Sequence, residues 1–214
     1  MHITSEPAIL YFGTPVVLVS TVNENGTYNL APMSSAWWLA WRCVLGFGAH
    51  SKTPQNMIRT RECVLNLPSA DMTGAVNRLA LTTGSNPVPA SKIARGYRYD
   101  PEKFATAGLT ARRSEAVAPP RVMECPVQLE ATVESVHPLA EQDEKWHGRL
   151  LAIEVRIRRV HLSEAILAED DSNRIDPDKW RPLIMSFQHF YGLTPDRLSD
   201  SRLARIPESL YRAS

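Results

Sequence analysis

The 214-residue chain has few cysteines and almost no net charge. Cys43, Cys63 and Cys125 are widely spaced and have no second Cys or His nearby at zinc-site spacing, so they predict reduced, partly buried thiols and no metal site. The 24 Lys and Arg residues balance 23 Asp and Glu residues, and a formal charge of +1 provides no field that gathers nucleic acid or an anionic membrane. Any partner is therefore expected to be recognised locally.

The sequence also shows no leader pattern and no long apolar run. Residues 1–10 show no basic start followed by an apolar stretch, and nowhere does the chain approach the roughly 20 apolar residues that span a bilayer. No internal repeat or low-complexity tract interrupts it. A single domain over residues 1–214, in a cytoplasmic protein without a membrane partner, is therefore expected.

Short apolar runs bounded by turn signals predict buried strands. The β-branched run Thr14–Thr21 is followed by Asn25-Gly26, a strong tight-turn signal, which predicts a strand entering a hairpin. Cys43–Gly48 and Cys63–Leu67 are two further apolar runs that end at glycine and before proline. Both are expected to be strands of the core.

Two longer segments alternate with the period of a strand that has one wet face. Val127–Glu134 and Leu151–Arg158 each place apolar residues on one side and charged residues on the other, so we expect antiparallel neighbours whose acids and bases pair. Segment 84–120 is rich in Pro, Gly, Ser and Arg without sustained periodicity, which predicts a long irregular excursion over the surface. The pattern as a whole predicts a β-rich α+β domain, a closed or split barrel with short helices.

The sharpest local motif runs from Ala49 to Pro54. Thr53 can cap a helix that starts at Pro54 and ends near Arg61, because proline lacks only an N–H that would be unpaired there. The hydroxyls of Ser51 and Thr53 and the ammonium of Lys52 would then lie at a helix N-terminus, which favours an anion such as phosphate. Simple capping with a solvated lysine explains the same residues, so the motif leaves both interpretations open.

A second motif, Asn29–Trp38, is a strip of small residues that runs into paired tryptophans. Small side chains let a flat ring approach the backbone, whose polar groups bond the ring edge while an indole packs against it. An isoalloxazine ring suits this description. A tight strand crossing, with Trp37, Trp38 and Trp41 as core or interface residues, suits it equally.

Taken in order, these motifs resemble the flavin reductase-like, FMN-binding split-barrel family, and most closely its flavoredoxin-like branch. The resemblance rests on Tyr11–Thr21, Asn29–Trp37, Ser51–Thr53, Cys63–Leu67, Lys103-Phe104, Gly108–Thr110, Glu124–Glu130, Asp176-Pro177 and Pro182-Leu183. Each motif is weak alone, but their colinear order is specific. The family implies a Greek-key split β-barrel with short peripheral helices, FMN as cofactor, and a homodimer with the flavin near the subunit interface.

The resemblance also implies roles for matching residues. Residues matching Met33, Ser34 and Ser35 line the flavin ring in the family, and residues matching Ser51, Lys52 and Thr53 take the phosphate, with Asn56 nearby. Trp37 and Lys103 match further flavin-contacting positions. The implied activity is an NAD(P)H:flavin reductase, in which NADH or NADPH reduces the bound flavin and a small-molecule acceptor takes the electrons. No side chain is assigned a catalytic role.

One departure from the family pattern keeps other functions open. Many nicotinamide-using members carry Gly-Asp-His before the penultimate strand, and counting back from Val155 places Trp146, His147 and Gly148 there. The expected histidine is a glycine, and a one-residue shift usually turns a neighbouring side chain to the other face. The alternatives are a flavoredoxin-like electron carrier or specialised flavoenzyme reduced by a partner, and a non-catalytic dimeric module that holds FMN or haem.

Overall fold

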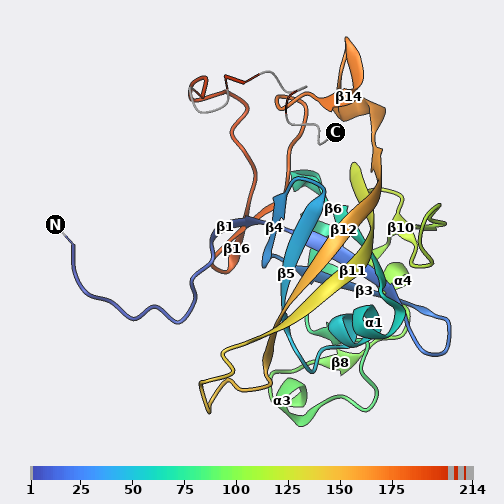
Figure 1. Ribbon diagram of the computed structural model, residues 1–214, viewed down its shortest axis with the longest axis vertical. Coiled ribbons are helices and arrows are strands. Elements are labelled where there is room, and N and C mark those ends of the chain that lie inside the picture. Colours follow the sequence, from blue (N-terminus) through green and yellow to red (C-terminus); the bar gives the residue numbers. More distant parts are fainter. Residues whose placement is uncertain (1, 202–204, 207–209, 211–214) are drawn as a thin grey trace.

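The structure is a computed structural model that describes residues 2–201, 205–206 and 210. Its main element is a seven-stranded antiparallel sheet of order β3-β2-β6-β11-β12-β5-β4, which curls into a barrel (Figure 1). The strands are β2 (Val17–Val22), β3 (Tyr28–Met33), β4 (Ala36–Leu39), β5 (Arg42–Gly48), β6 (Glu62–Leu67), β11 (Val127–Leu139) and β12 (Leu150–Leu162). The two edge strands, β3 and β4, are joined only by Ser34 and Ser35. This link therefore lies where the barrel is split.

The predicted hairpin and core strands are present, but the run Thr14–Thr21 is divided at Val16 between β1 (Phe12–Pro15), which lies in a small separate sheet, and β2. β2 and β3 pair across a tight turn in which Gly26 has a φ of +80°, a backbone conformation that favours glycine. β11 and β12 are antiparallel neighbours, as expected, although each extends over 13 residues. The alternation of apolar and polar residues in the two segments thus correctly predicted that they pair.

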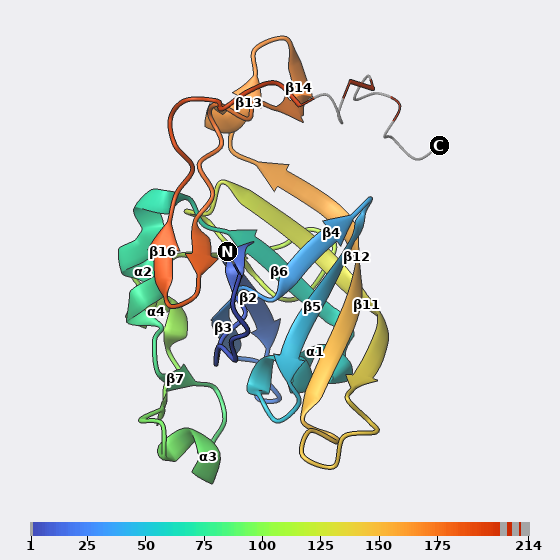
Figure 2. The same cartoon turned by 90° about the vertical axis from the view of Figure 1, so that its left-hand side faces the viewer.

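Two apolar cores lie on opposite faces of the sheet. Val17 and Val19 point into the barrel, whereas Val16 and Leu18 belong to the core on the outer face. β2 is buried on both sides, which explains its continuous apolar run. Helix α1 (Lys52–Thr60) closes the lower end of the barrel and buries Met57 in the inner core (Figures 1 and 2).

Short elements surround the barrel. Helices α2 (Thr73–Arg78) and α4 (Lys103–Ala107) cover the outer core, beside the small sheet β1-β15-β16 (Figure 2). That sheet and the remaining elements are β1 (Phe12–Pro15), η1 (Ala70–Met72), β7 (Thr82–Thr83), α3 (Ala90–Ile93), β8 (Arg98–Tyr99), β9 (Ala111–Arg112), β10 (Arg121–Val122), η2 (Glu164–Ile166), β13 (Leu167–Ala168), β14 (Asp171–Ile175), β15 (Ile184–Ser186) and β16 (His189–Tyr191). Within the described residues, none of the helices is long and apolar enough to cross a membrane.

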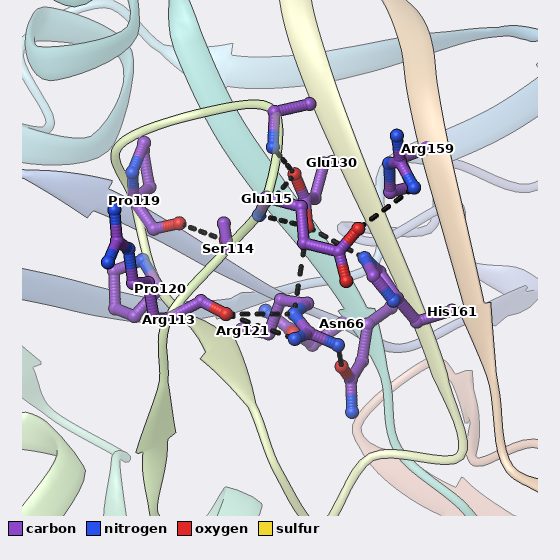
Figure 3. A network of polar contacts seen from close by, with 12 residues as sticks. Asn66, Arg113, Ser114, Glu115, Pro119, Pro120, Arg121, Glu130, Arg159 and His161 are labelled. Atoms are coloured by element: carbon purple, nitrogen blue, oxygen red, sulfur yellow. Dashed lines mark hydrogen bonds and ion pairs between the residues drawn. The ribbon is translucent and has the colours of Figure 1, made fainter.

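The expectation of a wet polar face on β11 is wrong at Gln128 and Glu130, which are buried, whereas Glu134 is exposed as expected. Glu130 is completely buried, because the end of the excursion lies over it (Figure 3). Its carboxylate accepts hydrogen bonds from the backbone N–H groups of Glu115 and Ala116 and from His161 Nε2, the last at 2.7 Å. Burial raises the pKa of Glu130, but these hydrogen bonds outweigh it and hold the pKa below its ordinary value. The carboxylate thus fastens the loop onto the sheet.

Candidate functional site

The N-terminus of α1 is open to an anion. The helix begins at Lys52 with Ser51 as N-cap, so the expected cap at Thr53 and start at Pro54 are wrong. Ser51 has the extended backbone of an N-cap (φ −84°, ψ 149°), which places Thr53 inside the first turn. No side chain caps this end and the first turn carries no acidic residue. Its free N–H groups and the helix dipole therefore favour a negatively charged ligand.

Buried amides join the β2–β3 hairpin to α1. Asn29 Nδ2 donates to Thr53 Oγ1 at 3.0 Å and to Thr21 Oγ1 at 3.3 Å. Asn56 Nδ2 donates to the same Thr21 oxygen at 3.0 Å and to Asn23 Oδ1 at 2.9 Å. Thr53 Oγ1 accepts from Asn29, so its own hydroxyl hydrogen remains available to a ligand at the helix start.

Gly84, the first residue of the excursion, packs directly on this network. A Cβ atom there would lie 2.5 Å from Asn29 Oδ1 and 3.1 Å from Lys52 Cγ. Asn29 Oδ1 is buried and has no hydrogen-bond partner within the described part of the chain. A glycine is therefore needed for this close approach of backbone to side chain.

The charge of Lys52 is compensated within the chain. Its Nζ lies 2.6 Å from a carboxylate oxygen of Glu24, and this hydrogen bond lowers the pKa of Glu24. Lys52 therefore contributes less net charge to an incoming phosphate than its position in the motif predicted.

The charge of Lys103, in contrast to that of Lys52, is not compensated by a described residue. Lys103 is the first residue of α4, its side chain is buried, and no described residue forms a hydrogen bond or ion pair with it. Burial, and then the nearby charge of Lys92, lower the pKa of Lys103 to about 8, while Asp100 acts in the other direction. A buried ammonium without a counter-ion is unfavourable unless an anion binds beside it.

The predicted ring-binding residues lie along the split of the barrel. Met33 ends β3, Ser34 and Ser35 form the link, and Trp37 lies on β4 with 56% of its surface exposed. The Ser35 carbonyl accepts the N–H of Gly46 at 2.8 Å. A Cβ atom at Gly46 would come within 3.1 Å of Ser35 Cβ, so the backbone at the split is tightly packed.

The two halves of the candidate site are connected by one strand. Asn29 and Met33 lie on the same face of β3, four residue steps or about 13 Å apart along the strand. The phosphate-type end at α1 and the flat strip at Ser35 are thus arranged along a single edge. Lys103 lies near Lys92, whose charge acts on it.

The position that lacks the family histidine is a turn. Gly148 has a φ of +67°, which disfavours any residue with a side chain, and it lies in the exposed loop between β11 and β12. His147 Nδ1 is 3.0 Å from the carbonyl oxygen of Glu141. The histidine next to the glycine is therefore engaged within its own loop.

The three cysteines are free and buried. Burial raises the pKa of Cys43 to about 12, and it raises the pKa of Cys63 and Cys125 as well. At neutral pH they are protonated thiols, which are poor nucleophiles.

Several residues of the site are not identified by the sequence motifs. Asn29 is the first residue of the small-residue strip, and the only feature that distinguishes it in the sequence is an amide side chain within an apolar strand. Gly84 and Lys92 lie in the excursion and carry no local pattern. Tyr11, whose hydroxyl lies 2.8 Å from Ser35 Oγ, precedes the first strand, and nothing in the sequence marks it beyond its place in the run Tyr11–Thr21.

Comparison with known proteins identifies the family. Residues 9–193 match the flavin reductase like domain, so the chain belongs to that family. It is 39% identical over 188 residues to the protein YdfE of Bacillus subtilis (strain 168), covering 88% of this chain and 87% of YdfE. The fold and the family together define a flavin-related oxidoreductase.

Solved structures support the same fold. The flavoredoxin of Desulfovibrio vulgaris (Miyazaki F) superposes with a TM-score of 0.74 at 19% identity, over 95% of this chain and 99% of the flavoredoxin. A Shewanella frigidimarina NCIMB 400 protein with a split barrel domain gives 0.69 at 17% identity, over 88% and 85% of the two chains. The predicted split β-barrel with short peripheral helices is therefore confirmed.

Proposed function

We propose that the chain binds FMN along the β3 edge and serves as an NAD(P)H-dependent flavin reductase. The observation that carries this proposal is the uncapped start of α1, tied by the Asn29–Thr53 hydrogen bond to the strand that leads to Ser35. An anion-binding helix end and a flat, small-residue strip at opposite ends of one strand match a ligand with a phosphate at one end and a planar ring at the other.

The residues present fit this cofactor. The N–H groups of the first turn and the hydroxyls of Ser51 and Thr53 would hold the phosphate, with Asn56 supporting them through Thr21. Met33, Ser34 and Ser35 would contact the ring, and Trp37 would flank it. When bound, the flavin supplies the two-electron chemistry, so the protein needs only to position it and tune its surroundings.

A second candidate function follows from Gly148. Residue 148 is a glycine in a left-handed turn, and the neighbouring His147 contacts the carbonyl oxygen of Glu141, so neither residue supplies a histidine at the family position. This favours an electron carrier or specialised flavoenzyme that is reduced by a partner protein.

The visible spectrum of the purified protein separates these functions. Flavin absorbance before and after anaerobic addition of NADH, and separately of NADPH, tests binding and reduction in one experiment. Rapid bleaching supports the reductase. Bound flavin that only a protein partner or dithionite reduces supports the carrier, and a protein that takes up haem or remains colourless with FMN contradicts both.

We also propose that the chain forms a homodimer through β4. Trp37, Leu39 and Trp41 are 56%, 72% and 57% exposed on this edge strand and the turn that follows. Large apolar side chains grouped on a surface are typical of protein interfaces. Since Trp37 is two residues from Ser35, such an interface would place the flavin ring close to the second subunit.

A further inference from the structure

The end of the excursion encloses a hollow on the outer face of the main sheet. It is lined by Ala111, residues 113–118 and Pro120 of the excursion, and by Tyr28 and Glu62, the first residues of β3 and β6. Its volume of about 630 Å³ lies within the roughly 300–1,000 Å³ of small-molecule sites. Tyr28 shares the outer-core face of β3 with Leu30, whereas Asn29 points to the opposite face. The hollow is therefore separate from the candidate flavin site.

The loop that walls the hollow is held in one position by hydrogen bonds. The backbone N–H of Ala118 donates to a carboxylate oxygen of Glu62 at 2.9 Å. Ser114 Oγ donates to the carbonyl oxygen of Pro119 at 2.6 Å, which closes the loop on itself (Figure 3). Together with the bonds to Glu130, these contacts fix both the loop and its height above the sheet. The hollow is thus preformed, as small-molecule sites usually are.

Opposite charges line the hollow without pairing with each other. The Arg113 guanidinium forms no hydrogen bond or ion pair with any residue that the structure describes. Glu62 accepts from Ala118 with one oxygen, and its other oxygen has no partner among the same residues. The third charged residue of the lining, Glu115, is already paired with Arg159 at 2.8 Å. The walls therefore offer a ligand one guanidinium and one carboxylate oxygen.

Tyr28 adds an aromatic surface to the same hollow. Its side chain is exposed, and its hydroxyl has no hydrogen-bond partner in the described part of the chain. The ring meets Phe104 edge-on, with centroids 6.4 Å apart and an interplanar angle of 70°. Val117 and Pro120 supply further apolar surface to the lining. An apolar group of a ligand can therefore pack here beside the two charges.

These groups exclude several kinds of ligand. No group of three His, Cys, Asp or Glu residues that could hold a metal ion occurs among the described residues, so the carboxylates do not form a metal site. A polyanion would be repelled by Glu62 and Glu115. A purely apolar molecule would cover Arg113 and Glu62 without giving either a partner, which is unfavourable. A small molecule that carries both charges satisfies the lining.

We propose that this hollow binds a small zwitterion, an amino acid with an apolar side chain. Arg113 binds the carboxylate of the ligand, for which the planar guanidinium has the matching geometry. The free oxygen of Glu62 accepts a hydrogen bond from the ammonium group, and the apolar side chain packs on the ring of Tyr28. The inference does not depend on the proposed flavin function, because the hollow and the candidate flavin site lie on opposite faces of β3.

The test uses L-phenylalanine together with hydrocinnamate, which lacks the ammonium group, and phenethylamine, which lacks the carboxylate. Calorimetry or ligand-observed NMR on the full chain measures the Kd of each. Arg113→Met is expected to raise the Kd of phenylalanine and of hydrocinnamate about tenfold and to leave phenethylamine no weaker. Glu62→Gln keeps an acceptor for Ala118. It is expected to raise the Kd of phenylalanine and of phenethylamine about tenfold and to leave hydrocinnamate no weaker.

Matched controls are Arg112→Met and Glu134→Gln, which remove the same charges from exposed residues outside the lining. Neither control should change the Kd of phenylalanine, and equal weakening by Arg112→Met would overturn the proposal. Wild-type protein that does not bind phenylalanine at millimolar concentration would also overturn it, as would a Kd that both Arg113→Met and Glu62→Gln leave unchanged. If Glu62→Gln disturbs the loop, Arg113→Met remains decisive, because no described residue depends on that guanidinium.

Discussion

The side-chain amide of Asn29 donates to the hydroxyl of Thr53 at 3.0 Å, and this bond connects strand β3 to the first turn of α1. Thr53→Val keeps the volume of the side chain but removes the hydroxyl. We expect it to weaken FMN by about 1–3 kcal/mol, because a hydrogen bond to the charged phosphate is lost, and to leave riboflavin unchanged. Titration of apoprotein with both flavins measures this. Thr60→Val, at the far end of the same helix, is the control, and equal weakening of both flavins would show that the phosphate lies elsewhere.

Gly84→Ala tests the close approach between the excursion and α1. The added methyl group would lie 2.5 Å from Asn29 Oδ1, so the excursion must move away from the hairpin. We expect a loss of about 1–3 kcal/mol in the free energy of unfolding, together with weaker FMN binding. The matched control is Gly74→Ala in α2, where the nearest atom to the new Cβ is a flexible guanidinium nitrogen of Arg78 at 3.6 Å. Urea unfolding that does not distinguish the two variants would contradict the packing argument.

The sequence predicted the strands better than it predicted their surroundings. β2, β5 and β6 were found because an apolar run bounded by turn residues depends only on neighbours in the chain. The polarity of Glu130 was also detected, but a buried carboxylate with its own hydrogen-bond donors produces the same alternation as a solvated one. Its donors come from residues 115–116, and no local pattern reports such a contact.

The same distinction between local patterns and long-range contacts applies to the residues of the candidate site. Ser51, Lys52 and Thr53 are contiguous, so helix-start rules could find them, although those rules chose the wrong cap. Asn29, Gly84 and Lys92 come from three separate segments, and only the fold brings the first two into contact. The compensation of Lys52 by Glu24 was equally hidden, since the two residues are 28 positions apart. Their roles in flavin binding remain predictions.

Glu130→Gln tests the attachment of the excursion to the sheet. The amide cannot accept from all the donors that surround the carboxylate, so we expect a loss of about 3 kcal/mol at pH 7. The pKa of Glu130 is lowered in the folded protein, so its stabilisation is present above its ordinary value of 4.5 and is lost as the pH falls through the folded pKa. The difference between wild type and variant should therefore shrink below about pH 4.5.

The control for this variant is Glu134→Gln on the same strand. The Glu134 side chain is 37% exposed and lies 3.8 Å from Arg42, so its replacement should cost no more than about 0.5 kcal/mol. Urea unfolding at several pH values from 7 down to about 3, so that the range extends well below the ordinary pKa of 4.5, measures both variants. A difference for Glu130→Gln that stays constant over this range would show that the carboxylate charge is not what holds the loop.

Trp41→Glu tests the proposed dimer. Trp41 is 57% exposed beside the edge strand β4, and a charge in the centre of an apolar interface should raise the dimer dissociation constant at least 100-fold, about 3 kcal/mol. Light scattering coupled to size-exclusion chromatography would then report a monomer, with weaker flavin binding. Met123→Glu changes a residue of similar exposure, 54%, on the outer face and should leave the mass unchanged. A monomeric wild type would refute the interface.

Lys103 gives the site a pH dependence whose sign is fixed by the direction of its pKa shift. Burial lowers its pKa from 10.5 to about 8, which corresponds to about 3 kcal/mol against the charged form in the folded apoprotein. Between about pH 8 and 10.5 the unfolded chain binds this proton and the folded chain does not, so this group makes stability rise with pH there. An anionic ligand needs the protonated lysine, so its affinity should fall over the same range.

Lys103→Met separates these two effects. At pH 7 the variant apoprotein should be more stable than wild type by about 2–3 kcal/mol, because a buried charge without a partner has been replaced by an apolar side chain. Its affinity for phosphate-bearing ligands should be lower than that of wild type at pH 7. As the pH rises from 7 to 9.5, the variant should not show the fall in affinity that deprotonation of Lys103 causes in wild type. Thermal unfolding and flavin titration over that range measure both. If wild type and variant lose flavin affinity in parallel above pH 8, another group controls the pH dependence and Lys103 is not part of the anion site.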